Sequence, residues 1–181
     1  PVAYSAVVLK EYGSLENLDL MEFPDPIPGP EEIIVDVRAT AVNYVDLVLI
    51  GGTYQFRPEI PFVPGKGPAG VVKAVGENVH DFAPGDRVLA MAEQGGYAEF
   101  APIHRNNCYR LPDGLSFSDA ASMALVYDTA WFSLVERGRF EAGEAVLVLG
   151  ASGGVGLAAI QLVNALSGTA LAGIANPGKA D

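Results

Sequence analysis

The sequence is poor in the residues that build disulfides and metal centres. It contains one cysteine, Cys108, and two histidines, His80 and His104, among 181 residues. One thiol excludes an intrachain disulfide framework, and one Cys with two His cannot build a four-thiolate structural zinc site. We expect Cys108 to be a buried thiol rather than a nucleophile, and both histidines to be surface or structural residues.

Charge is also scarce, and it is mostly of one sign. Charged residues make up 18% of the chain, and 22 acids against 11 bases give a net charge of −11. Such a surface repels phosphate backbones and anionic membranes, so neither nucleic acid nor a membrane is an expected partner. The first residues lack the basic, apolar and small-residue segments of a signal peptide, which predicts a cytoplasmic location. Half of the residues are hydrophobic, which excludes a disordered chain.

Residues 145–178 contain no charged side chain at all. A run of this length is nominally long enough to span a membrane. However, Gly150, Gly153, Gly154 and Gly156 lie near one end, and a membrane helix would have to keep its backbone bonded through them. A strand, a tight turn, a buried helix and a second buried strand fit better, because parallel strands covered on both faces have continuous apolar sequences.

The first 112 residues indicate mostly β structure. Short strand patterns occupy 4–10, 33–41, 70–75 and 97–103, another follows the turn at 84–86, and Gly and Pro separate them. Pro24, Pro26, Pro28 and Pro30 forbid regular ladders and predict an extended loop. Residues 43–51 predict a short helix that begins near Asn43. Together these patterns predict a compact, barrel-like β domain.

The pattern changes after residue 114. Ser116 or Ser118 can cap a helix with Asp119 in its first turn, and helical texture continues over 119–137. A strand at 145–150, a helix at 156–166 and a strand at 169–175 then form one β-α-β unit. The predicted fold class is therefore mixed α/β.

The turn after the first of these strands carries the most specific motif. The dinucleotide fingerprint G-x-G-x-x-G has the form Ala151-x-Gly153-x-x-Gly156 here. Gly153 lets a pyrophosphate approach the backbone, Gly156 lets the helix pack closely on the strand, and the helix N-terminus holds the phosphates. The alternative is a glycine-rich turn that serves only packing.

The end of the second strand indicates which dinucleotide binds. An acid there, about 20 residues past the glycines, would bond the 2′-hydroxyl of NAD. This chain instead has Asn176 and Lys179, which could receive a 2′-phosphate, so NADP(H) is favoured. The alternative is that Lys179 is a solvated loop residue.

The motifs in combination resemble the medium-chain dehydrogenase/reductase superfamily, and within it the zinc-independent NADPH:quinone oxidoreductase group, which includes zeta-crystallin-like proteins. The resemblance rests on segments 39–54, 61–79, 85–88, 95–100, 111–121, 129–134 and 146–162. It implies a GroES-like domain at 1–115, followed at 116–181 by a linking helix and the first β-α-β unit of an incomplete Rossmann NADP(H)-binding domain.

The resemblance also implies that zinc is absent. Zinc-dependent members have a catalytic Cys where this chain has Asn43, and Gly-His-Glu where it has Gly65, Lys66 and Gly67. The four clustered Cys of their structural lobe are missing. No metal ligand is therefore expected.

By the same resemblance, Asn43 lines the nicotinamide and substrate pocket and hydrogen-bonds a carbonyl, and Tyr54 borders that pocket. These two are the expected catalytic residues. Thr129 is expected near the nicotinamide ribose, and Asp46 as a structural partner for a base. Asn43, Tyr54 and Thr129 also have structural alternatives as a helix cap, a packed aromatic and a helix-interior hydroxyl. The expected cofactor-binding residues are Asn43, Thr129, Ser152, Gly153, Gly154, Val155, Gly156, Asn176 and Lys179.

The expected activity is hydride transfer from NADPH to a quinone or another conjugated carbonyl compound, with solvent delivering the proton. The alternatives are an enoyl reductase, a non-catalytic NADPH-binding or structural protein, and an inactive fragment. Members of the family continue for nearly as long again beyond the point matching Asp181. We therefore expect a truncated chain that binds NADPH weakly or not at all, and a full-length homodimer.

Overall fold

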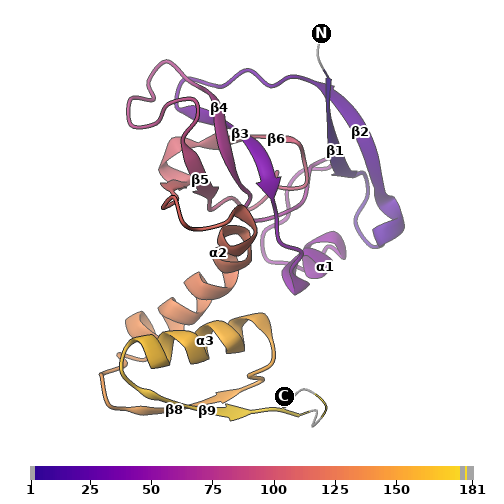
Figure 1. Ribbon diagram of the computed structural model, residues 1–181. Helices are drawn as coiled ribbons and strands as arrows, with labels where there is room; N and C mark the ends of the chain where they lie inside the picture. Colours follow the sequence, from indigo (N-terminus) through magenta and orange to yellow (C-terminus); the bar gives the residue numbers. More distant parts are fainter. Residues whose placement is uncertain (1–2, 176–177, 179–181) are drawn as a thin grey trace. The chain divides into compact units, whose positions relative to one another are not determined.

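The computed structural model describes residues 3–175 and 178. The chain forms two compact units, residues 1–124 and residues 125–181. The division falls inside helix α2, Phe117–Trp131. The boundary expected at 115/116 stays a prediction. The predicted mixed α/β class is confirmed (Figure 1).

The first unit contains two antiparallel sheets. Strands β1 (Ala3–Leu9) and β2 (Leu18–Pro24) form a two-stranded ribbon. A second sheet has the order β6-β3-β4-β5-β7. Its members are β3 (Glu32–Ala39), β4 (Ala69–Val75), β5 (Arg87–Ala90), β6 (Phe100–His104) and β7 (Cys108–Arg110).

The cores explain why these segments form strands. Ile33 and Val35 of β3 and Val88 of β5 are fully buried in one cluster with Val72 of β4. A second cluster joins Leu9 and Phe62 to helix α1, Tyr44–Ile50. At about 25 cal/mol per Å² of buried apolar surface, such side chains supply most of the favourable free energy of folding.

Two strands were not predicted, and one prediction about proline was wrong. The ribbon's strand β2 is half exposed, and β7 has only three residues. Pro24 was assigned to the extended loop, but it is the last residue of β2 and lies opposite Ala3. A ribbon edge tolerates proline, since no further strand needs its missing N–H.

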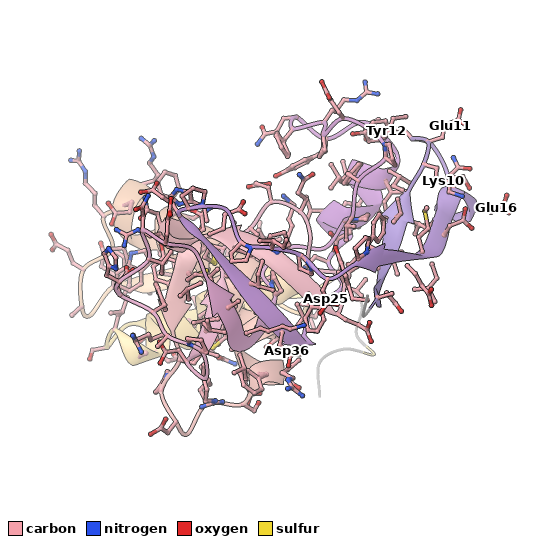
Figure 2. The ribbon with its side chains drawn as sticks, turned by 90° about the horizontal axis from the view of Figure 1, so that it is seen from above. Lys10, Glu11, Tyr12, Glu16, Asp25 and Asp36 are labelled. Carbon is pink, nitrogen blue, oxygen red and sulfur yellow. The ribbon has the colours of Figure 1, made fainter. Side chains whose placement is uncertain are left out.

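Charged side chains cover the turn end of the ribbon. Figure 2 shows Lys10, Glu11 and Glu16 there. Lys10 pairs with Asp19 at 2.6 Å, both about half exposed. The 3-10 turn η1 (Leu15–Asn17) joins the strands, and η2 (Arg105–Asn107) precedes β7. His104 caps η2 and lies 3.2 Å from Glu31, which matches the structural role expected for it.

The second unit is the predicted β-α-β motif. Strand β8 (Ala145–Leu149) runs parallel to β9 (Thr169–Gly173), and α3 (Gly154–Ala165) connects them. Val148, Ala158 and Ala159 pack against Ala130 of α2. Leu147 and Leu149 of β8 are 62% and 78% exposed, and β8 pairs with β9 alone among the described strands.

Helix α2 and the turn after it cover the predicted helical segment, and the structure shows which serine caps it and a change of helix type near its end. Ser116, rather than Ser118, caps it by accepting a hydrogen bond from the N–H of Asp119 at 3.0 Å. The predicted helical segment 119–137 is continuous, but its last part, η3 (Phe132–Arg137), is a π-helix. Over the described residues, no helix is both long and apolar enough to cross a membrane.

Candidate functional site

The glycine-rich turn of the second unit runs from β8 into α3. Gly150 has φ +75°, a left-handed conformation that glycine adopts without strain. The N–H groups of Gly150 and Ala151 donate to the carbonyl of Gly173 at the end of β9, at 2.9 and 3.1 Å. The turn is therefore fixed to both parallel strands at their carboxyl ends, where ligands of open α/β sheets bind.

Two glycines of this turn are required for different reasons. A Cβ on Gly156 would lie 2.4 Å from the carbonyl oxygen of Gly150 and 2.8 Å from the Cα of Ala151, so close packing excludes any side chain. A Cβ on Gly153 would meet nothing nearer than 3.4 Å, and φ is an ordinary −86°. Packing within the described chain thus explains Gly156 but does not explain Gly153.

The first turn of α3 also presents unpaired donors. The backbone N–H groups of Gly154, Val155 and Gly156 have no acceptor one helical turn earlier within α3, as at any helix start. Ser152 and Gly153 precede them and are exposed. An open backbone position followed by free N–H groups and a positive dipole end fits the pyrophosphate of a dinucleotide.

The remaining expected cofactor residues are less informative. The Thr129 hydroxyl is exposed but donates to the carbonyl of Leu125 at 2.8 Å, inside its own helix. That geometry is the helix-interior alternative, although the oxygen can still accept a hydrogen bond. Asn176 and Lys179 lie outside the described residues. The choice of NADP(H) over NAD(H) therefore stays a sequence-based prediction at these two positions.

In the first unit, a buried carboxylate fixes Asn43. Asp46 is 2% exposed, and its Oδ2 accepts from the N–H of Asn43 and from the hydroxyl of Tyr97, both at 2.8 Å. Asn43 is the N-cap of α1, and its side-chain amide is partly exposed. The expectation that Asp46 supports a base is wrong, because its partners are a tyrosine and a backbone amide.

Tyr97 connects this carboxylate to the Pro/Gly loop. A Cβ on Gly65, which has φ +96°, would lie 2.6 Å from both the N and the Cδ1 of Tyr97. The Tyr97 N–H donates to the carbonyl of Pro64 at 2.9 Å. Burial, followed by the hydrogen bond to Asp46, raises the pKa of Tyr97. This tyrosine therefore stays a neutral hydrogen-bond donor.

Lys66 was not expected at the site, and it is the most unusual side chain of the first unit. It is 4% exposed, it forms an ion pair with Glu93, and its Nζ lies 4.7 Å from the ring centroid of Tyr54. The sequence predicts a site role for Tyr54 and none for Lys66, and nothing local marks the burial of a lysine in a Pro/Gly loop.

The residues where zinc-dependent relatives carry ligands do not fit a zinc ion. Asn43 offers an amide, Lys66 offers a cation, and Gly67 offers no side chain. A Cβ on Gly67, which has φ +65°, would lie 2.4 Å from the Cβ of Ala124. Over residues 3–175 and 178, no group of three or more His, Cys, Asp or Glu side chains could hold a metal ion.

Cys108 is the buried thiol that the sequence indicates. It is 7% exposed within the main core of the first unit. Burial, followed by the charge of Asp81, raises its pKa to about 12. A thiol of this kind holds almost no thiolate at neutral pH and is not a nucleophile.

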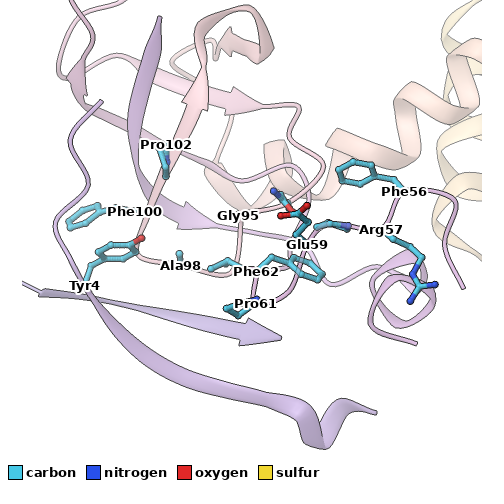
Figure 3. A pocket seen from close by; sticks show the side chains of 13 residues that line it. Tyr4, Phe56, Arg57, Glu59, Pro61, Phe62, Gly95, Ala98, Phe100 and Pro102 are labelled. Carbon is cyan, nitrogen blue, oxygen red and sulfur yellow. The ribbon is translucent and has the colours of Figure 1, made fainter. Parts of the chain in front are cut away.

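An open pocket of about 660 Å³ also lies in the first unit (Figure 3). Aromatic and proline side chains line it, with Arg57 and Glu59 on one side. The Tyr4 and Phe100 rings, 5.7 Å apart, form its other end. Neither Asn43 nor Tyr54 lines it, and no motif in the sequence indicates it.

Similarity to known proteins covers both units. Residues 29–113 match the alcohol dehydrogenase GroES-like domain family. Human quinone oxidoreductase is 42% identical over 162 residues, which are 88% of this chain and 49% of that protein. The chain thus spans about half the length of the curated relatives it matches.

Solved structures agree in fold. A mycobacterial protein complexed with NADPH matches with a TM-score of 0.88 at 31% identity, over 98% of this chain and 55% of that one. The CurK enoyl reductase matches with a TM-score of 0.86 at 28% identity, over 97% and 55%. The predicted resemblance is confirmed: the chain carries a GroES-like domain and belongs to the medium-chain dehydrogenase/reductase superfamily.

Proposed function

We propose that the polypeptide carrying this chain is an NADPH-dependent oxidoreductase that reduces a quinone or another conjugated carbonyl compound without zinc. The observation that carries the proposal is the open backbone position at Gly153, followed by the free N–H groups of α3. The names of two relatives support it, since one is a quinone oxidoreductase and the other binds NADPH.

NADPH, when bound, supplies a hydride. The chain's contribution is to hold the pyrophosphate on the N–H groups of Gly154–Gly156, with Ser152 and Gly153 beneath it. Thr129 would accept a hydrogen bond from the ribose, and Asn176 and Lys179 would receive the 2′-phosphate. These residues orient the reacting carbon and have no part in the bond changes.

On the acceptor side, the Asn43 amide would donate a hydrogen bond to the carbonyl oxygen. Asp46 and Tyr97 hold the backbone of Asn43 in place, so little entropy is lost when the amide binds. Tyr54 would stack on a flat acceptor ring. No step requires a Lewis acid in this scheme.

The test is NADPH oxidation by the complete polypeptide against matched acceptors: a para-quinone, an enone and a saturated ketone. We expect the first two to be reduced and the third to be inert, since conjugation delocalises the negative charge created by hydride addition, whereas a saturated ketone needs a stronger electrophilic catalyst at its oxygen than an amide. If none of the three acceptors causes the NADPH absorbance to fall, the proposal is overturned. Turnover that disappears after chelation and returns with Zn²⁺ would overturn its zinc-free part.

The second candidate is an enoyl reductase, favoured by the fold shared with the CurK enoyl reductase. An α,β-unsaturated thioester reduced at least as fast as the quinone would support it. A third outcome, enhanced NADPH fluorescence without consumption by any acceptor, would indicate a non-catalytic NADPH-binding protein instead.

We further propose that the complete polypeptide is a cytoplasmic homodimer. The family resemblance supports the dimer, and the sequence features above support the location. Light scattering of the complete polypeptide gives its mass, and a monomer at micromolar concentration would refute the dimer. Recovery with the membrane fraction would refute the location.

A further inference from the structure

Lys66 is a cation almost fully withdrawn from water. Its side chain is 4% exposed, and burial of an ammonium is strongly unfavourable unless charges and hydrogen bonds compensate. Lysine is among the residues least often buried in folded proteins. The position therefore needs an explanation beyond the conformation of the loop.

Different groups compensate the positive charge of Lys66 on the different sides of its ammonium. One side is the Glu93 carboxylate, whose side chain is 62% exposed, and another is the face of the Tyr54 ring. An ammonium has three N–H donors. In the part of the chain that the structure describes, Glu93 is the only hydrogen-bond acceptor recorded for Nζ, so donors remain for an incoming group.

Lys66 follows a residue that packs against the hydrogen-bonded group holding Asn43. The preceding residue, Gly65, packs against Tyr97, and the Tyr97 hydroxyl donates to Asp46, which accepts from the N–H of Asn43. Tyr54 contacts the ammonium directly. Of the two side chains expected to hold the acceptor, Tyr54 thus contacts Lys66 itself, and Asn43 is held by residues that pack against the neighbouring Gly65.

We propose that Lys66 is the acid of the reaction: its ammonium donates the proton to the acceptor's carbonyl oxygen. The inference rests on the proposed function. It assigns to Lys66 the proton transfer for which solvent was the expected source. It also defines the acceptor class, namely conjugated carbonyl compounds whose oxygen gains negative charge on reduction.

Hydride addition to a carbon of the conjugated acceptor moves an electron pair onto its oxygen, and the Lys66 ammonium transfers one proton to that oxygen. The Glu93 carboxylate takes up a proton from solvent at its exposed side and passes it to the resulting amine, which restores the ion pair. The sum is NADPH, one proton and acceptor going to NADP⁺ and reduced acceptor.

A purely structural ion pair is the competing explanation. Buried ion pairs contribute little net stability, and apolar replacements of similar volume are often equally stable. A relay, in contrast, needs one buried donor and one partner that water reaches. Lys66 at 4% and Glu93 at 62% exposure have this asymmetry.

The test compares four forms of the complete polypeptide: wild type, Lys66→Met, Lys66→Arg and Lys73→Met. Arg keeps the charge but does not release a proton in proteins, so it preserves a structural pair and removes the acid. Lys73 is the matched control, because it also pairs with a carboxylate, Asp25, and lies over an aromatic ring, Phe100. Both Lys66 variants should lose about 10²–10⁴-fold in kcat with unchanged NADPH affinity. Lys73→Met should equal wild type.

A binding measurement gives a readout that does not depend on turnover. 4-Nitrophenol mimics the reduced acceptor, and its visible spectrum distinguishes phenolate from phenol. With NADP⁺ present, the wild type should hold a larger phenolate fraction than Lys66→Met at the same pH. In Lys66→Ala, methylammonium should restore part of the lost kcat, because it supplies a proton donor to the vacated space.

The outcomes separate the two proposals. An active wild type with equally active Lys66→Met or Lys66→Arg overturns the acid role and leaves the proposed function standing. Equal phenolate fractions in wild type and Lys66→Met overturn it too. A wild type inactive towards all acceptors overturns the proposed function, and the acid role with it.

Discussion

The glycine-rich turn allows cofactor binding and folding to be separated by single methyl groups. Gly153→Ala adds a Cβ that meets no described atom nearer than 3.4 Å, whereas Gly156→Ala adds one 2.4 Å from the carbonyl oxygen of Gly150. Gly114→Ala is the control, since its Cβ would meet nothing within 4 Å and its φ is not left-handed.

The magnitudes follow from these distances. Gly153→Ala should change the free energy of unfolding by less than about 0.5 kcal/mol, as substitutions without contacts usually do. The same methyl group lies where the pyrophosphate must approach, and an overpacking cost of about 1–3 kcal/mol weakens NADPH binding about 5- to 150-fold. Gly156→Ala should cost about 1–3 kcal/mol of stability, because a backbone carbonyl cannot move aside as a side chain can.

The assays are NADPH fluorescence titration and thermal unfolding of the complete polypeptide. Hydrogen exchange over residues 145–175 localises any loss of stability to the second unit. Gly114→Ala should match wild type in all three measurements. The reasoning is refuted if Gly153→Ala binds NADPH as wild type does, or if Gly156→Ala is as stable as Gly153→Ala.

Three further predictions concern the first unit. Asp46→Ala should lower the free energy of unfolding by about 1–3 kcal/mol, because it removes the acceptor of the Asn43 N–H and leaves the Tyr97 hydroxyl only the carbonyl of Ala41 at 3.5 Å. Tyr97→Phe should cost about 1 kcal/mol, and equal losses in urea titrations would contradict this. Burial, then the bond to Asp46, raises the pKa of Tyr97 above its usual 10.0, so its contribution to stability is complete below that pH and is lost as the pH rises above it. Wild type should therefore lose stability above pH 10 more steeply than Tyr97→Phe, and parallel alkaline unfolding curves would argue against it. Cys108, whose pKa is raised to about 12, should resist iodoacetamide in the native state and react only in denaturant; alkylation at the rate of a free thiol would show that the core is open.

Local signals predicted the elements that the chain builds from neighbouring residues. Asn43 and Gly51 limit α1 as expected, and the strand, glycine turn and helix over 145–166 lie within a few residues of their predicted positions. Caps, breakers and apolar periodicity act over one or two turns, so a single sequence contains them.

Other elements depend on partners far along the chain. Strand β2 has only half-exposed and exposed residues, so no apolar alternation identifies it, and its pairing with β1 determines it. The π-helix at Phe132–Arg137 has the same helical texture as α2, and nothing in the sequence marks the wider turn.

The site was predictable only in part for the same reason. The glycine fingerprint is contiguous, and packing within the described chain explains Gly156 but not Gly153. The contacts of Lys66 with Glu93 and of Asp46 with Tyr97 join residues 27 and 51 positions apart. A loop lysine and a helix-start aspartate therefore have ordinary local sequences, although each is buried in the folded unit.

The contact between Gly67 and Ala124 restricts which residue can stand at position 67. Any side chain at position 67 would place its Cβ 2.4 Å from the Cβ of Ala124 while occupying a left-handed backbone at φ +65°. A left-handed conformation costs a non-glycine residue about 1–2 kcal/mol. A carboxylate at position 67 therefore needs a second change, such as Ala124→Gly, as well as a strained backbone, so the residue at position 124 determines whether position 67 can carry an acid.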